Sequence, residues 1–205
     1  MYARIAFFEG GGPDIAETAR RLFREQFLPE MQKLQGFAGT IQLGDMDARR
    51  GVGIVLFDSE DALRAGDEKL NAMSPPAEMG DTRRTGVEMY EVTINELGQD
   101  AGAARLSRMR GSADKIDETV RFAEESILPA VRRIEGARGA LGLADRKTGD
   151  VTIITFWESP EAMRASEQEA DRLRSQTAEK SGGTITGVER FDAVLMEVPV
   201  GALRR

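Results

Sequence analysis

Hydrophobic and polar positions along the first half of the chain predict six elements in a fixed order. Apolar residues three and four positions apart predict an amphipathic helix over 14–35, and a second helix is expected over about 60–73. Runs of alternating or β-prone residues predict four strands, over 3–9, 38–44, 51–57 and 87–95. The resulting order is strand, helix, strand, strand, helix, strand.

The predicted helices carry recognisable end signals and one internal conflict. Asp14 is placed to cap the first helix, Gly36 to end it, and Ser59 to cap the second. Pro29 falls inside the first helical pattern, although it lacks the N–H that a helix interior requires. We therefore expect Pro29 to kink this helix or to end its first segment.

The second half of the chain repeats this pattern. Matching residues stand 100 positions apart near the middle of each half, as Leu28-Pro29 and Leu128-Pro129 do, and 101 apart near the ends. In this half, helices are predicted over 116–134 and 160–174, and strands over 140–143, 151–157 and 188–198. We therefore expect two copies of one domain, at 1–97 and 103–200, joined by the polar linker 98–102.

The repeated order predicts an α+β protein made of two tandem ferredoxin-like (β-α-β-β-α-β) repeats. Both helices of a repeat are then expected on one face of its antiparallel sheet. Strands such as 52–57 are apolar on both sides, so the other face must also be covered. We expect the two sheets to pack on each other, as a pseudo-dimer within one chain.

The amino-acid composition excludes several kinds of catalytic and metal-binding site. The chain has 205 residues and a net charge of −7, with no cysteine and no histidine. It therefore lacks a thiolate nucleophile, a Ser-His-Asp triad and imidazole or cysteine ligands, and we expect neither a metal nor a cofactor. The acidic balance speaks against nucleic acid and anionic membranes as partners. No apolar stretch approaches the ~18 residues needed to cross a bilayer. With no visible targeting signal and mostly arginine among its basic residues, the chain is expected to be cytoplasmic and bacterial.

Three features carry a resemblance to a known family. They are the Leu-Pro segment near the end of each first helix, the segment 57–65 that recurs as 157–165, and the element order over about 100 residues. In these features both halves resemble antibiotic-biosynthesis-monooxygenase-like domains of the dimeric α+β barrel superfamily. The resemblance implies a pocket between the helices and the sheet of each half, and a tandem copy that replaces the usual homodimer.

The enzymes of that family include cofactor-independent monooxygenases acting on polycyclic aromatic molecules, haem-degrading oxygenases, and lactone or dehydratase-type enzymes. The haem-degrading branch relies on an Asn, Trp and His set, which a chain without histidine cannot provide. The fold alone does not choose among the other activities.

Two arginines at matching positions are candidate site residues. Arg4 and Arg105 lie in the first predicted strand of each half, where a charged side chain needs a partner. In a functional interpretation, they stabilise an acidic or enolic oxygen of a substrate. In a structural one, they pair across the sheet with Glu91 and Asp192 of the last strands, or lie at the rim of the barrel.

Two aromatic residues are further candidates. Trp157, the only tryptophan, would stack on a flat ligand and donate its N–H, or serve as a large core residue. Tyr90 would donate a proton or orient a substrate, although its counterpart is Phe191. The loop 10–14 lacks the spacing of a phosphate or dinucleotide loop, and Asp45-Met46-Asp47 is expected to be a hairpin tip rather than a metal site.

Three functional hypotheses follow. The first is a cofactor-independent monooxygenase-like protein that binds a small apolar or aromatic molecule, with Arg4, Tyr90, Arg105 and Trp157 as candidate catalytic residues. The second is a non-catalytic ligand-binding or stress-related module. The third is a structural protein that binds a partner through its helices. Whether two such chains form a further homodimer is left open.

Overall fold

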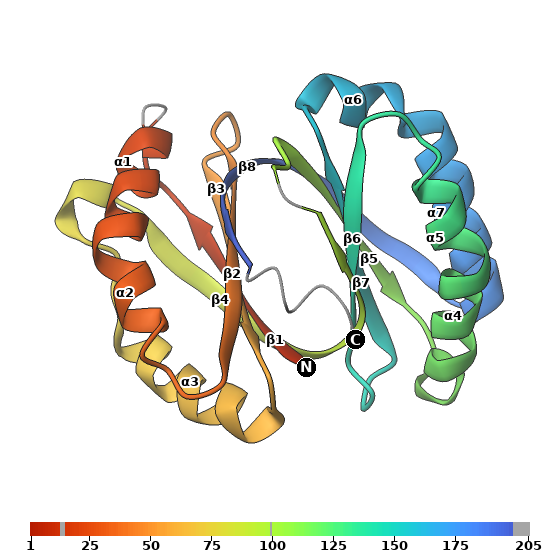
Figure 1. Ribbon diagram of the computed structural model, residues 1–205, viewed down its shortest axis with the longest axis horizontal. Helices are drawn as coiled ribbons and strands as arrows, with labels where there is room; N and C mark the ends of the chain where they lie inside the picture. The colour runs from red at the N-terminus through yellow and green to blue at the C-terminus, as the bar shows by residue number, and fades with distance from the viewer. Residues whose placement is uncertain (13–14, 99, 199–205) are drawn as a thin grey trace. The chain divides into compact units, whose positions relative to one another are not determined.

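The computed structural model describes residues 1–12, 15–98 and 100–198 (Figure 1). Hydrogen-bonded strands follow one another in the closed order β1-β3-β2-β8-β5-β7-β6-β4. The described residues divide into two compact units, one built from Met1–Met89 with the residues 193–198, the other from Tyr90–Asp192. The predicted capping residue Asp14 lies outside the described residues.

The first half of the chain supplies most of the first unit. Its elements are β1 (Tyr2–Glu9), α1 (Ile15–Leu22), the π-helical segment η1 (Phe23–Phe27), α2 (Leu28–Met31), β2 (Phe37–Asp45), β3 (Arg50–Phe57), α3 (Glu60–Ala72), the short 3-10 helix η2 (Ala77–Met79) and β4 (Arg83–Leu97). Helices of this unit lie on one side of its strands (Figure 1).

The second half follows a similar course. Its elements are β5 (Ala103–Arg110), η3 (Ala113–Lys115), α4 (Ile116–Phe122), the π-helical segment η4 (Ala123–Ile127), α5 (Leu128–Val131), β6 (Ala137–Ala144), β7 (Asp150–Trp157), α6 (Pro160–Ala165), α7 (Glu167–Ser181) and β8 (Thr184–Glu197). Strand β7 pairs antiparallel with β5 and β6, as β3 does with β1 and β2. The prediction of an α+β protein with antiparallel strands is confirmed.

Strands β4 and β8 each contribute to both units. Beyond Met89, β4 belongs to the second unit, where Glu91–Leu97 pair with β6. Strand β8 pairs with β5 up to Asp192, and from Ala193 it belongs to the first unit. Each unit therefore contains a strand end from the other half of the sequence. The limits predicted for the two repeats stay predictions.

Pro29 is accommodated by a wide turn rather than by a break. The preceding residues Phe23–Phe27 form a π-helical segment, in which the N–H of Leu28 donates to the carbonyl of Phe23. Pro29 then falls in the first turn of α2, where a missing N–H costs little. The same arrangement surrounds Pro129 in the second half.

One predicted helix boundary is wrong. The helix expected over 160–174 is interrupted at Ser166 and then continues as α7 to Ser181. Residues 175–181 contain no proline or glycine, so nothing stops the helix before Gly182, whose φ is +64°. In the first half, Pro75 and Pro76 follow α3 closely, which prevents a similar extension.

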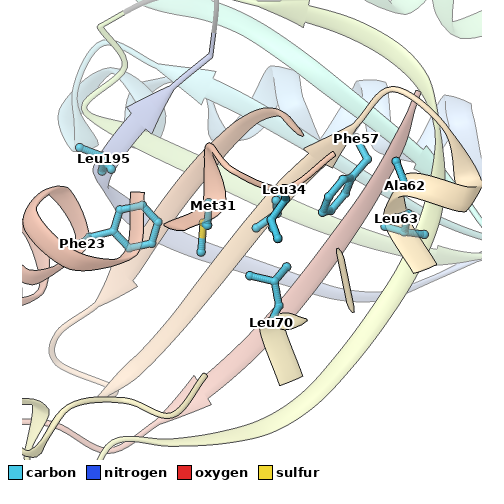
Figure 2. Packing of buried hydrophobic residues seen from close by; sticks show 9 residues of the cluster. Phe23, Met31, Leu34, Phe57, Ala62, Leu63, Leu70 and Leu195 are labelled. Atoms are coloured by element: carbon cyan, nitrogen blue, oxygen red, sulfur yellow. The ribbon is translucent and has the colours of Figure 1, made fainter. Parts of the chain in front are cut away.

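A hydrophobic core joins distant parts of the first unit (Figure 2). Its buried members are Phe23, Met31, Leu34, Val55, Phe57, Ala62, Leu63, Leu70 and Leu195. Gly66 of α3 lies so close to Phe57 that an added Cβ would collide with the ring. Leu195, from the end of β8, packs with residues near the start of the chain. Burial of such a side chain stabilises a fold by roughly 1.5–3 kcal/mol.

No helix within the described ranges is both long and apolar enough to span a lipid bilayer.

Candidate functional site

The first unit contains a cavity of about 180 Å³ between its helices and its strands. Its walls are mostly apolar. The helical side and the loop after α3 contribute Ile15, Ala19, Leu22, Phe23, Phe27, Met31, Met73 and Met79, and the strands contribute Ala6, Phe8, Val52, Val55 and Val194. A hollow in this position agrees with the pocket that the sequence resemblance implies.

Arg4 brings the main polar group to this cavity. Its side chain lines the cavity, and the residue is only 3% exposed. Nε donates to Asp67 Oδ1 at 2.7 Å and one terminal nitrogen, Nη2, donates to Asn71 Oδ1 at 2.9 Å, both on α3. No hydrogen bond from Nη1 is found in residues 1–12, 15–98 and 100–198.

Gln42 of β2 is a second polar residue that lines the cavity. Its Nε2 donates to Thr40 Oγ1 at 3.0 Å, while Thr40 donates to the carbonyl of Ile54 at 2.8 Å. Because Nε2 is fixed in this way, the amide oxygen of Gln42 is the atom available to accept from a ligand hydroxyl. Arg4 and Gln42 thus provide a donor and an acceptor on the strand side of the cavity.

Two further arginines line the cavity. Arg50 pairs with Asp45 at 2.9 Å, and Arg84 donates to the carbonyls of Leu70 and Asn71 at the end of α3. Burial opposes ionisation of Asp45, but the Ala48 N–H and Arg50 outweigh it and lower its pKa. No carboxylate partner of Arg84 is found within the described part of the chain, so the site carries an excess of positive charge.

The segment 73–82 covers one side of the cavity, to which it contributes Met73, Pro75, Pro76, Met79 and Thr82. Asp81 anchors this segment. It accepts from the Gly11 N–H at 2.7 Å and from Arg49 Nη2 at 2.8 Å. These contacts lower the pKa of Asp81, with the Gly11 N–H as the larger cause and Arg49 as the next. The anchor therefore stays ionised at neutral pH.

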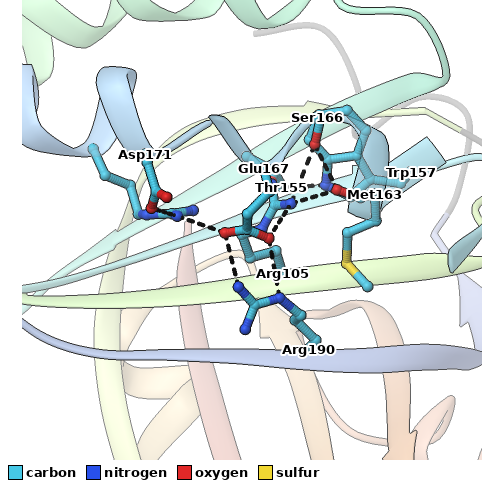
Figure 3. Close-up of polar contacts among 9 residues, drawn as sticks. Arg105, Thr155, Trp157, Met163, Ser166, Glu167, Asp171 and Arg190 are labelled. Atoms are coloured by element: carbon cyan, nitrogen blue, oxygen red, sulfur yellow. Dashed lines mark hydrogen bonds and ion pairs between the residues drawn. The ribbon is translucent and has the colours of Figure 1, made fainter. Parts of the chain in front are cut away.

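The second unit places its matching arginine in a tighter cluster (Figure 3). Arg105 is 1% exposed, and its Nη2 donates to the Met163 carbonyl at 2.5 Å, to Ser166 Oγ at 3.1 Å and to Glu167 at 3.0 Å. Its guanidinium also lies over the ring of Trp157. Such a ring face offsets part of the cost of burying a cation.

Glu167 is the centre of this cluster. It pairs with Arg105, Arg174 and Arg190. Burial would raise the pKa of Glu167, but hydrogen bonds from Arg190 and Arg174 and the charge of Arg105 lower it from 4.5 to about 2. The pKa of Arg105 is lowered, first by burial and then by the charge of Arg174, against the opposing effect of Glu167. The cluster is an ionic support for the second unit.

The structure separates the four predicted site residues. Arg4 lines the cavity of the first unit, whereas Arg105 and Trp157 contact each other in the second. Trp157 is 1% exposed, packs with Ala103 and Met163, and donates its indole N–H to Thr155 Oγ1 at 3.1 Å. Tyr90 is buried in β4 and is not among the residues that line the cavity.

The expected cross-strand partners of the arginines are corrected. Arg4 pairs with Asp67 and Arg105 with Glu167, both on the helix that follows the hairpin. Glu91 instead pairs with Arg146. The side chains of Arg4 and Arg105 reach a helix because they leave the sheet on the helix-covered face, as alternation along a strand requires.

Several residues of the site were missed in the sequence: Gln42 and Arg84 line the cavity, and Asp67 and Asn71 hold Arg4. The spacing of Asp67 and Asn71 by four positions is a signal that both project from one face of a helix. Within the ranges that the structure describes, no group of three or more acidic residues could hold a metal ion.

Comparison with other sequences finds relatives over the full length. No family model matches the chain. It is 23% identical over 209 residues to the uncharacterized protein Rv2557 of Mycobacterium tuberculosis strain H37Rv, with 100% of this chain and 90% of the relative covered.

Solved structures show the fold more directly. An anthrone oxidase-like protein matches 97% of this chain and 93% of its own, with a TM-score of 0.63 and 14% identity. A ferredoxin-fold protein related to antibiotic biosynthesis monooxygenases, from Listeria monocytogenes, covers 93% and 94%, with a TM-score of 0.54 and 8% identity. The haem-degrading enzyme LmHde of the same species covers 94% and 99%, with a TM-score of 0.54 and 10% identity. The chain therefore shares the fold of monooxygenase-like ferredoxin-fold proteins.

Proposed function

We propose that this protein binds a small, largely apolar aromatic molecule in the cavity of the first unit and holds one oxygen atom of that molecule through Arg4. The observation that carries the proposal is a buried guanidinium whose Nη1 has no hydrogen bond to the described residues, at a cavity with mostly apolar walls. An apolar pocket with a few polar groups that fix orientation is typical of small-molecule sites.

The size of the cavity sets the size of the ligand. Its volume is about 180 Å³, and an apolar cavity of roughly 150 Å³ is known to hold benzene. One or two fused rings therefore fit. A haem group does not fit, since the macrocycle is far larger and the lining residues include no His, Cys or Tyr.

The charge of the site favours an acidic oxygen. Arg4 and Arg50 each have a carboxylate partner, whereas Arg84 donates only to carbonyls, so the balance beside the ligand is positive. A nearby positive charge lowers the pKa of a bound phenol or enol. The amide oxygen of Gln42 is placed to accept a hydrogen bond from the hydroxyl of a ligand that stays neutral.

Calorimetric titration with 1-naphthol tests this function. We expect saturable binding to the wild-type protein and affinity at least about fivefold weaker for Arg4→Lys, because a compact ammonium cannot reproduce a planar fork that also holds Asp67 and Asn71. Arg105→Lys, at the matching strand position of the second unit, is the control and should leave the affinity unchanged. No binding of 1-naphthol or related phenols by the wild type would overturn the proposal.

A cofactor-independent monooxygenase is the second candidate function. It is supported by the fold, shared with an anthrone oxidase-like protein, and by an arginine placed to stabilise a deprotonated ligand oxygen. In the reaction to be tested, the two-ring probe 1-naphthol and O₂ give 1,4-naphthoquinone and water. An oxygen electrode should record uptake that Arg4→Lys slows. Binding without oxygen uptake would leave the ligand-binding function alone.

We also propose that residues 1–97 and 103–200 descend from one duplicated domain. The π-helical segments Phe23–Phe27 and Ala123–Ile127 stand 100 residues apart, and each precedes a Leu-Pro pair. Arg4 and Arg105 also occupy matching strand positions, opposite Val55 and Thr155.

A further inference from the structure

The cavity extends toward strand β3 because two of the residues that line it there are glycines. Gly51, Val52 and Gly53 of β3 line the cavity, and the two glycines contribute no side chain to it. Gly53 pairs with Ala6 on one side and with Gln42 on the other, and the nearest side-chain groups above it are the Gln42 amide and the Phe8 ring.

The backbone does not require glycine at these two positions. A Cβ at Gly51 would meet its nearest atoms at 3.6 Å, which is ordinary contact. A Cβ at Gly53 would lie 3.0 Å from Gln42 Oε1 and 3.5 Å from the Phe8 ring, so the Gln42 amide, which Thr40 holds, would have to shift. By contrast, Gly139 has a φ of +122° and sits directly against the Glu96 carbonyl, so glycine is needed there. Gly51 and Gly53 therefore leave room above the sheet.

The second unit fills the corresponding place. Ile153 of β7 pairs with Ser107 and Gly142, just as Gly53 pairs with Ala6 and Gln42. With Val151, it lines a void of only about 20 Å³ under α4 and η4. This volume holds about one water molecule. The two units thus differ at the floor of the same hollow.

From this contrast we infer that Gly53 is a specificity-determining residue, that the room above it admits the second ring of the ligand, and that the protein binds one ligand per chain because Val151 and Ile153 close the second unit. The inference rests on the proposed function and adds to it a limit on ligand size and a stoichiometry. It places the site in the first unit alone.

The test compares two probes that differ by one ring, 1-naphthol and phenol, on Gly53→Val. We expect the variant to bind 1-naphthol at least about tenfold more weakly, while phenol changes less than about threefold, since a valine would occupy the room that we assign to the second ring. The wild type should bind one 1-naphthol per chain. Gly86→Ala, whose added Cβ would lie 3.7 Å from Phe7 and outside the cavity, is the control and should behave as wild type.

Each other outcome has a definite meaning. Unchanged 1-naphthol affinity in a folded Gly53→Val, equal weakening of both probes, or two molecules per chain would overturn the inference while the proposed function stands. Absence of binding by the wild type would overturn the proposed function itself. If circular dichroism shows Gly53→Val to be unfolded, Gly51→Val replaces it under the same criteria, since its Cβ meets no close neighbour.

Discussion

The guanidinium carbon of Arg105 lies 5.2 Å from the centre of the Trp157 ring. Two residues proposed from the sequence as site residues therefore contact each other, but as buried parts of a polar cluster in the second unit. Arg4, at the matching strand position, instead lines a cavity. An arginine at the matching strand position therefore stabilises the second unit, whereas in the first unit it is a candidate ligand contact.

Replacing Trp157 by Phe, the residue found at position 57, should test its structural role. We expect the free energy of unfolding to fall by about 1–2 kcal/mol, because the ring loses contact with Arg105 and the indole N–H loses Thr155. Urea unfolding followed by circular dichroism measures this change. The affinity for 1-naphthol should not change, and a large loss of affinity would place Trp157 at the site after all.

Glu167 should make stability depend on pH. Its folded pKa of about 2 lies below the ordinary 4.5, so its contribution is complete above pH 4.5 and is lost as the pH falls toward 2. Glu167→Gln leaves buried Arg105 without its carboxylate and should lower stability at pH 7 by roughly 2–4 kcal/mol. The unfolding free energy of Glu167→Gln should also vary less than that of the wild type between pH 4.5 and pH 2.

The control for this experiment is Glu169→Gln on the same helix. Glu169 pairs with Arg172 at the surface, and removal of such a pair should leave stability unchanged. Equal effects of the two substitutions would refute the central role of Glu167.

Leu195 offers a test of the core of the first unit. It is 4% exposed and packs with Phe23 and Met31, although it lies near the other end of the sequence. Leu195→Ala should destabilise the protein by about 2–4 kcal/mol, since it leaves a cavity in that core. Ile185→Ala, at a position that is 40% exposed on the same strand, should have little effect. Chemical denaturation measures the free energy of unfolding of both variants and thus tests this difference.

Asp81 should control how fast a ligand exchanges. It ties the covering segment 73–82 to Gly11 and Arg49. Asp81→Asn weakens both contacts and should raise the dissociation rate of 1-naphthol several-fold, as stopped-flow fluorescence would record. Glu78→Gln, a change of the same kind in the same segment, serves for comparison. Identical dissociation rates in all three proteins would rule out an anchoring role.

Much of the fold was predictable because local signals agree with one another. Ser59 caps its helix as the sequence suggests, and Ser159 does the same in the second half, each accepting from an N–H three residues later. Periodicity could not reveal the π-helical segments, since one extra residue per turn leaves no compositional mark. Nor could it show where α7 ends, because residues 175–181 suit both helix and loop.

The candidate site was harder to predict. Arg4 and Arg105 look alike in the sequence, and only their surroundings distinguish them: Asp67 and Asn71 hold one, and Glu167 holds the other. The cavity depends on glycines such as Gly53, and a glycine in a strand sequence does not by itself indicate a cavity.

The exchange of strand ends has a consequence for synthesis. Residues of the first unit leave the ribosome early, yet that unit includes Val194 and Leu195, which emerge only after Asp192 of the second unit. The unit that begins first is thus completed after the other, and its cavity lacks Val194 until the end of β8 has been made. A nascent chain that stalls just after Asp192 would carry the second unit whole and the first one unfinished.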